Sequence, residues 1–141
     1  MDPQLRTFTV EEAQALIPNL TALLIQLKEK QKKAMGLETQ IDALELIADR
    51  ESERSVQELN QLIEKHHAEA TEFYAIVDKI HGHGCVLKDA QTGLIDFYAV
   101  INGKVVYLCW KLGEKAIDHW HDVGKGFSSR EPLANLLHGE D

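Results

Sequence analysis

The sequence predicts an α+β protein in which a long antiparallel helical hairpin precedes a three-stranded antiparallel β-meander and short C-terminal helices. Before residue 84, apolar residues recur every three or four positions, which is the helical period. After it they alternate with polar residues, as in a strand. Asn102-Gly103 separates two alternating runs and strongly indicates a two-residue hairpin turn. We therefore expect a helical domain, 1–83, and a small sheet domain, 84–141.

The first helical segment should begin at Val10. Thr9 and Glu12 form a capping box, in which each side chain accepts a hydrogen bond from the other residue's backbone N–H. Pro18 has no backbone N–H and disfavours helix at the residue before it, so we expect a kink or break near Ile17, with Pro18 in the first turn of a second helix. The apolar stripe of that helix is Leu20, Leu23, Leu27, Ala34, Leu37, Ile41, Leu44 and Ala48.

The next long helix should begin after a second capping box, formed by Ser55 and Glu58. Its apolar residues keep a heptad register, which is typical of a coiled coil, and we expect the one histidine in it, His66, to have a partner at the interface. Gly82 is expected to cap the C-terminus. The heptad positions are Val56, Leu59, Ile63, His66, Ala70, Phe73, Val77 and Ile80.

Three strands should follow, over 85–88, 94–101 and 104–111. One face of the last two is apolar and should pack on helices. A helix over 114–122 and a short one from Pro132 are expected to end the chain. The apolar face carries Ile95, Phe97, Ala99, Ile101, Val106, Leu108 and Trp110.

The opposite sheet face carries chemically active side chains. In a two-residue hairpin the register runs outward from the turn, which places Asp96 opposite Cys109. A four-residue loop before Gly93 would also pair Cys85 with Asp96. A loop one residue longer or shorter would turn Cys85 to the other face.

We predict a metal site at the junction of this sheet and the C-terminal helix, formed by Asp96, Cys109, Glu114 and His121. Glu114 and His121 are seven residues apart, so they would share one face of the expected helix. These four residue types are ligands of Zn²⁺ and Fe²⁺. A water molecule in an open coordination position would make the site hydrolytic, but no motif identifies a substrate.

Packing alone offers another interpretation of the same residues. Glu114 in a first helical turn is favoured by the helix dipole, and Cys109 can act as a small buried apolar residue. Asp96 can accept hydrogen bonds from backbone amides. The segment 81–85, His-Gly-His-Gly-Cys, is a second candidate for a metal, without a fourth ligand nearby.

Composition excludes some classes of protein. The net charge of −8 over 141 residues disfavours general binding to nucleic acid. The apolar runs are too short to span a bilayer. The first residues do not resemble a signal peptide, so we expect a cytoplasmic protein with reduced thiols.

Three segments carry a resemblance to a known family. They are F-T-V-E-E-A-x-x-L-I-P (8–18), L-K-D-x-x-x-G-L-I-D-F (87–97) and V-Y-L-C-W-K-L-G-E-x-x-I-x-x-W-H (106–121). The chain resembles a family of bacterial proteins catalogued as a domain of unknown function. The resemblance implies a bacterial, cytoplasmic origin and no mechanism. The family pattern matches Asp96, Cys109, Trp110, Glu114, Trp120, His121 and Arg130, and Tyr98 stands where the family usually has proline.

The sequence is compatible with three functions. The long helical hairpin favours an interaction module that associates with itself, as a homodimer or higher oligomer, or with another protein. The cluster of possible ligands favours a metal-dependent or thiol-dependent enzyme, or a metal sensor without turnover. Zinc or iron is the expected cofactor of the last two.

Overall fold

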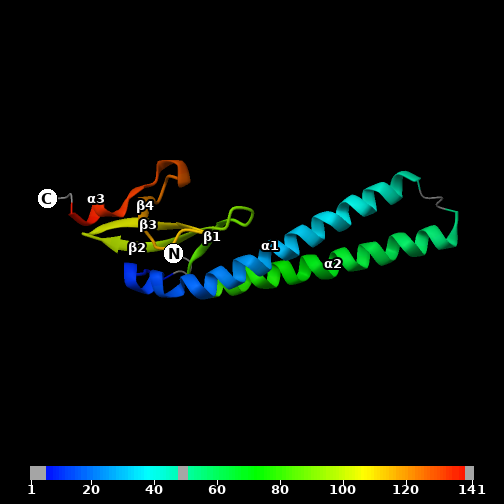
Figure 1. The fold of residues 1–141 in the computed structure, drawn as a ribbon, viewed down its shortest axis with the longest axis horizontal. Coiled ribbons are helices and arrows are strands. Elements are labelled where there is room, and N and C mark those ends of the chain that lie inside the picture. The colour runs from blue at the N-terminus through cyan, green and yellow to red at the C-terminus, as the bar shows by residue number, and fades with distance from the viewer. Residues whose placement is uncertain (1–5, 48–50, 139–141) are drawn as a thin grey trace. The chain divides into compact units, whose positions relative to one another are not determined.

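The computed structural model describes residues 6–47 and 51–138, and it confirms the α+β class (Figure 1). The sheet has five strands rather than the predicted three. All are antiparallel, and they lie side by side in chain order. The elements are α1 (Val10–Ile47), α2 (Glu53–Gly82), β1 (Val86–Asp89), β2 (Leu94–Ile101), β3 (Lys104–Lys111), β4 (His119–Asp122), the 3-10 turn η1 (Phe127–Ser129), β5 (Glu131–Pro132) and α3 (Leu133–His138).

Helix α1 begins at Val10, as predicted. The Thr9 N–H donates to Glu12 Oε1 (2.9 Å), and the Glu12 N–H donates to Thr9 Oγ1 (3.0 Å). The predicted break near Ile17 is wrong, because α1 continues through Pro18. Proline within a helix costs about 3 kcal/mol, which burial of apolar residues on both sides of it, such as Ala13 and Leu20, can offset.

Helix α2 begins at Glu53, so its capping residue lies three residues before the predicted Ser55. The capping residue is Ser52, whose Oγ accepts a hydrogen bond from the Ser55 N–H (3.4 Å) and whose carbonyl accepts one from Val56 (3.1 Å). Gly82 is the last helical residue rather than the cap. The chain turns at Gly84, which has a φ of +92° that glycine adopts without strain.

The contacts divide the chain into two compact units, one within residues 1–24 and 78–141 and the other within residues 25–77. In the second unit, α1 and α2 run side by side, and Lys30 forms ion pairs with Glu69 (3.2 Å) and Glu72. His66 Nε2 lies 3.2 Å from a Glu38 carboxylate oxygen, as a partnered interface histidine should. Among the described residues of this unit, only two side chains are buried, Leu27 and Ile76.

The β2–β3 hairpin has the predicted register. Asn102 (φ 53°) and Gly103 (φ 78°) both have the positive φ of a type I′ turn. Ile101 pairs with Lys104, and the pairing continues outward until Asp96 lies opposite Cys109.

The first strand does not have the register that would pair Cys85 with Asp96. Val86, not Cys85, pairs with Asp96, and the strand is irregular between Leu87 and Asp89. Cys85 precedes the strand and is buried, and its thiol donates a hydrogen bond to the Ile80 carbonyl (3.4 Å). This outcome corresponds to the alternative in which Cys85 does not share the face of Asp96.

The predicted helix over 114–122 is wrong, because this segment forms a loop and strand β4. Trp120 pairs with Leu108 of β3, and its indole is buried. Pro132 also lies in a strand, β5, which pairs with β4, and the last helix begins one residue later at Leu133.

The core of the first unit lies between the apolar sheet face and the helical segments, as predicted. The Phe8 and Phe97 rings meet edge to face, with centroids 5.2 Å apart. Leu20 and Leu24 are fully buried here, so neither is available to a partner. None of the described helices is both long enough and apolar enough to cross a bilayer. The buried residues on the sheet face are Ile95, Phe97, Ala99, Val106, Leu108 and Trp110.

Candidate metal centre

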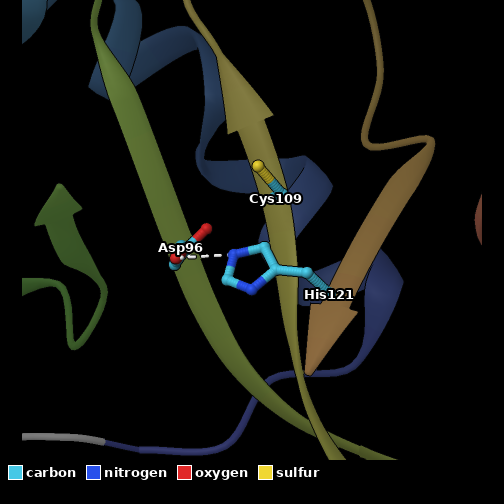
Figure 2. Close-up of side chains that lie close together, drawn as sticks. All are labelled: Asp96, Cys109 and His121. Atoms are coloured by element: carbon cyan, nitrogen blue, oxygen red, sulfur yellow. Dashed lines mark hydrogen bonds and ion pairs between the residues drawn. The ribbon is translucent and has the colours of Figure 1, made fainter. Parts of the chain in front are cut away.

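Three predicted ligands meet on the sheet face opposite this core (Figure 2). Asp96 on β2 lies opposite Cys109 on β3. His121 on β4 pairs with Tyr107, which is two residues before Cys109 and therefore on the same face. One ligand atom from each of the three lies within 4.8 Å of the others, and all three residues are at most 2% exposed.

Two hydrogen bonds fix the ring of His121. Its Nδ1 lies 2.9 Å from the Asp122 carbonyl oxygen, which can only accept, so Nδ1 carries a proton and donates it. Its Nε2 lies 3.0 Å from Asp96 Oδ2. Either Nε2 donates to a carboxylate or it accepts from a protonated Asp96. A histidine that ligates a metal is usually oriented in this way, with its other nitrogen bonded to a carbonyl or carboxylate.

The Asp96 carboxyl has an environment that favours its neutral form. Burial raises its pKa above the ordinary value, although His121 and Lys88 oppose this effect. Lys88 Nζ lies 3.9 Å from Oδ2 and also 4.6 Å from the centroid of the Tyr107 ring. Within the described part of the chain, Asp96 Oδ1 is buried without a hydrogen-bond partner. Such an atom destabilises the fold unless another group binds it.

The Cys109 thiol lies near both the Asp96 carboxyl and the Arg130 guanidinium. Burial raises its pKa to about 11, the Asp96 charge acts in the same direction, and Arg130 opposes both. Arg130 Nη1 lies 3.8 Å from Cys109 Sγ. The free thiol is therefore protonated at neutral pH, and a metal that binds here must displace its proton.

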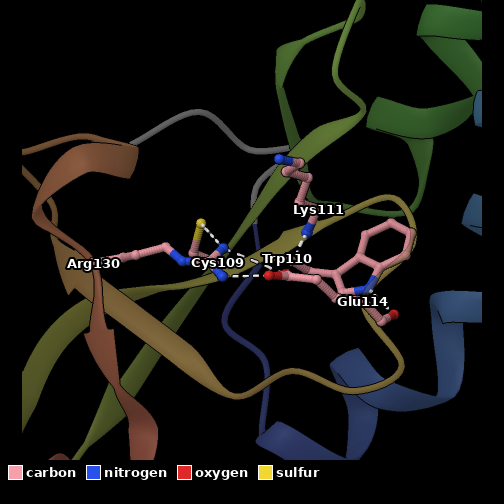
Figure 3. A network of polar contacts seen from close by, with 5 residues as sticks. All are labelled: Cys109, Trp110, Lys111, Glu114 and Arg130. Carbon is pink, nitrogen blue, oxygen red and sulfur yellow. Dashed lines mark hydrogen bonds and ion pairs between the residues drawn. The ribbon is translucent and has the colours of Figure 1, made fainter.

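Glu114, the fourth predicted ligand, does not join this cluster (Figure 3). It lies in the β3–β4 loop, where it forms an ion pair with Arg130 and accepts a hydrogen bond from the Lys111 N–H (2.9 Å). Burial raises its pKa, but the Arg130 and Lys111 hydrogen bonds outweigh that effect, so the pKa lies below its ordinary value. Arg130 thus links Glu114 to Cys109.

Sequence reasoning assigned no role to Arg130 or Lys88, the two cations that border the cluster. Arg130 is one of the residues that match the family pattern, and that match was the one signal that could have identified it. The alternative site in segment 81–85 is not supported by a ligand cluster among the described residues. His81 Nε2 accepts a hydrogen bond from the Leu87 N–H (3.2 Å).

Comparisons with known proteins are consistent with the resemblance. Residues 6–133 match the family model described as uncharacterized conserved protein (DUF2203). Comparisons with curated proteins and with solved structures gave no significant match. The family model covers far more than half of the chain, so the chain belongs to the DUF2203 family of uncharacterized conserved proteins.

Proposed function

We propose that this protein binds a divalent metal ion, preferentially Zn²⁺, through Asp96, Cys109 and His121. The observation that carries the proposal is the convergence of their donor atoms within 4.8 Å from three adjacent strands. Thiolate, imidazole and carboxylate together suit Zn²⁺ well, and Fe²⁺ is the second choice.

The geometry supports this assignment. In a tetrahedral site with bonds of 2.0–2.3 Å, donor atoms lie about 3.3–3.6 Å apart. A maximum separation of 4.8 Å therefore requires a contraction of about 1 Å. The ion would take the place of the proton between Asp96 and His121. It would also provide a partner for the unpaired Asp96 Oδ1.

The charges of the ligands and of Arg130 also support metal binding at this site. A carboxylate and a thiolate together neutralise a divalent cation, so the buried site gains no net charge when the metal replaces the protons. Arg130 Nη1 lies 3.8 Å from the sulfur and favours the thiolate. The nearby Glu114 carboxylate balances the guanidinium.

Burial favours a structural or sensing role over hydrolysis. A metal-dependent hydrolase needs an open coordination position that water and substrate can reach. The three ligands are at most 2% exposed. An ion bound here would join β2, β3 and β4 and stabilise the sheet.

The test is metal analysis of protein purified without an affinity tag, followed by zinc titration of chelator-treated protein. We expect one zinc ion per chain and a rise in Tm when zinc is added. Cys109→Ala should lose both effects. Cys85→Ala is the matched control, because Cys85 is equally buried but lies outside the cluster. Equal zinc binding by the Cys109 variant, or no binding by the wild type, would refute the proposal.

Cobalt separates lost binding from lost folding. In the wild type, Co²⁺ should give the near-ultraviolet charge-transfer absorption of a cobalt–thiolate bond. The Cys85 variant should keep this band and the Cys109 variant should lose it. Circular dichroism in chelator establishes that each variant is folded before metal is added.

We propose self-association of the helical hairpin as a second function. The second unit buries only Leu27 and Ile76 among its described residues. Large apolar side chains remain exposed on α1, including Ile25 (58%), Met35 (58%) and Leu46 (86%). Exposed apolar residues in such numbers favour a protein interface. Sedimentation at micromolar concentration tests this function, and a monomer throughout would contradict it.

A further inference from the structure

One face of α1 has no partner among the described residues of the second unit. The residues that face α2 recur at Leu27, Lys30, Ala34, Leu37, Ile41 and Leu44. A second row, displaced by two residues and hence by about 200° around the helix, is exposed at every position. We call it the outer stripe, and it consists of Ile25, Lys28, Lys32, Met35, Thr39, Asp42 and Leu46.

The outer stripe of one chain is complementary to the outer stripe of a second chain that runs antiparallel to it. Its midpoint lies between Met35 and Gly36. Ile25 precedes Met35 by 10 residues, and Leu46 follows Gly36 by 10. Likewise Lys28 precedes Met35 by 7, and Asp42 follows Gly36 by 6. An antiparallel copy would therefore bring apolar ends together and place a lysine beside an aspartate twice, once on each side of a two-fold axis.

The charges of the stripe are free to form such pairs. Within the described residues, neither Lys28 nor Lys32 has an ion-pair partner, and Asp42 has none. A parallel arrangement would instead place like charges together, which costs several kcal/mol in interfaces and so excludes wrong pairings. A Cβ at Gly36 would meet no atom within 4 Å, so a second helix has space near the axis.

We propose that two copies of this chain associate through the outer stripe, with α1 antiparallel to α1 of the partner. The contact extends from Ile25 to Leu46, about 32 Å of helix. This inference rests on the proposed self-association and specifies its surface. It leaves the face of α1 that contacts α2 unchanged.

Charge reversal tests the surface. Lys28→Glu with Lys32→Glu gives a chain whose outer stripe is acidic (the acidic chain), and Asp42→Lys gives one whose outer stripe is basic (the basic chain). Each should dimerise at least about tenfold more weakly than wild type, because like charges then meet across the axis. An equimolar mixture of the two chains should form heterodimers, and the triple variant should dimerise again. Lys125→Glu, an exposed position in the first unit, is the control and should dimerise as wild type does.

Sedimentation velocity distinguishes the possible failures. If the wild type is a monomer at all micromolar concentrations, self-association itself is refuted. If the wild type dimerises and the acidic and basic chains do so equally well, self-association stands and the outer stripe is refuted. All four variants change exposed residues, and circular dichroism confirms their helical content.

Cross-linking tests the orientation. Cys85 and Cys109 are buried, so an introduced exposed cysteine is the reactive thiol. Under mild oxidation, Met35→Cys should form an interchain disulfide with itself. Ile25→Cys should cross-link to Leu46→Cys in a mixture and not to itself. An Ile25→Cys chain that cross-links to itself would refute the antiparallel arrangement.

Discussion

Replacing Asp96 by alanine should destabilise the metal-free protein strongly. Asp96 and His121 are 1% and 2% exposed, and Oδ2 lies 3.0 Å from Nε2. Removing one partner of a buried hydrogen-bonded pair costs about 1–3 kcal/mol when the pair is neutral and about 3–5 kcal/mol when it is charged, because the remaining polar group loses both water and its partner. A domain of this size has a free energy of unfolding of about 5–15 kcal/mol, so the loss would be a large fraction of it.

Asparagine at the same position should be tolerated much better. Its amide can donate to Nε2 while His121 Nδ1 still donates to the Asp122 carbonyl. We expect Asp96→Asn to lower the free energy of unfolding by about 1 kcal/mol. Asp78→Ala, which changes an exposed helical carboxylate, should change it by less than about 0.5 kcal/mol.

The assay is urea unfolding in EDTA, followed by circular dichroism. A loss below about 1 kcal/mol for Asp96→Ala would refute the reasoning that a buried hydrogen-bonded pair holds these strands. If the asparagine variant is as unstable as the alanine variant, the hydrogen bond to His121 Nε2 is not what stabilises the site.

Two further outcomes follow from the structure. Gly93→Ala should cost more stability in urea unfolding than Gly103→Ala: both positions have positive φ, but only at Gly93 does a new Cβ meet Leu112 Cβ, at 2.7 Å. An equal loss would contradict this. Glu114→Gln should lower the free energy of unfolding at pH 7 by about 1 kcal/mol, since the Arg130 pair is partly exposed. Because the folded-state pKa of Glu114 is depressed, the pair contributes fully above the ordinary value of 4.5, and the difference from wild type should disappear as pH falls from there through the lower folded-state pKa.

Local signals predicted the hairpin and half of the site. The Asn102-Gly103 turn fixes the β2–β3 register, and with it the pairing of Asp96 with Cys109. No long-range information is needed for this, because the loop has two residues. The first strand lacks such a turn. With its irregularity between Leu87 and Asp89, Val86 rather than Cys85 pairs with Asp96.

His121 lies in the cluster as predicted, but it is on a strand and not on the predicted helix. The seven-residue interval from Glu114 suggested a helix, but residues 119–122 form a strand that covers the edge of β3. A four-residue strand with one central apolar side chain, Trp120, is too short for its periodicity to identify it. Its pairing with β3 is a long-range preference that the local sequence does not contain.

The division of the first unit has a consequence for the order of folding. Its two parts are joined by hydrogen bonds between residues distant in sequence, from Phe8 to Tyr98 (2.7 Å) and from Ile117 to Gln14 (2.9 Å), and the second pair is 103 positions apart. Closing such long loops is entropically unfavourable and slow. These loops are shorter in a chain in which Lys30 already contacts Glu69, because that contact brings the two ends of the inserted helices together. Each helical turn that α1 and α2 form together reduces the length of chain that must be ordered when Phe8 docks. We therefore expect the inserted α1–α2 hairpin to lower the entropic cost of bringing the two parts of the first unit together.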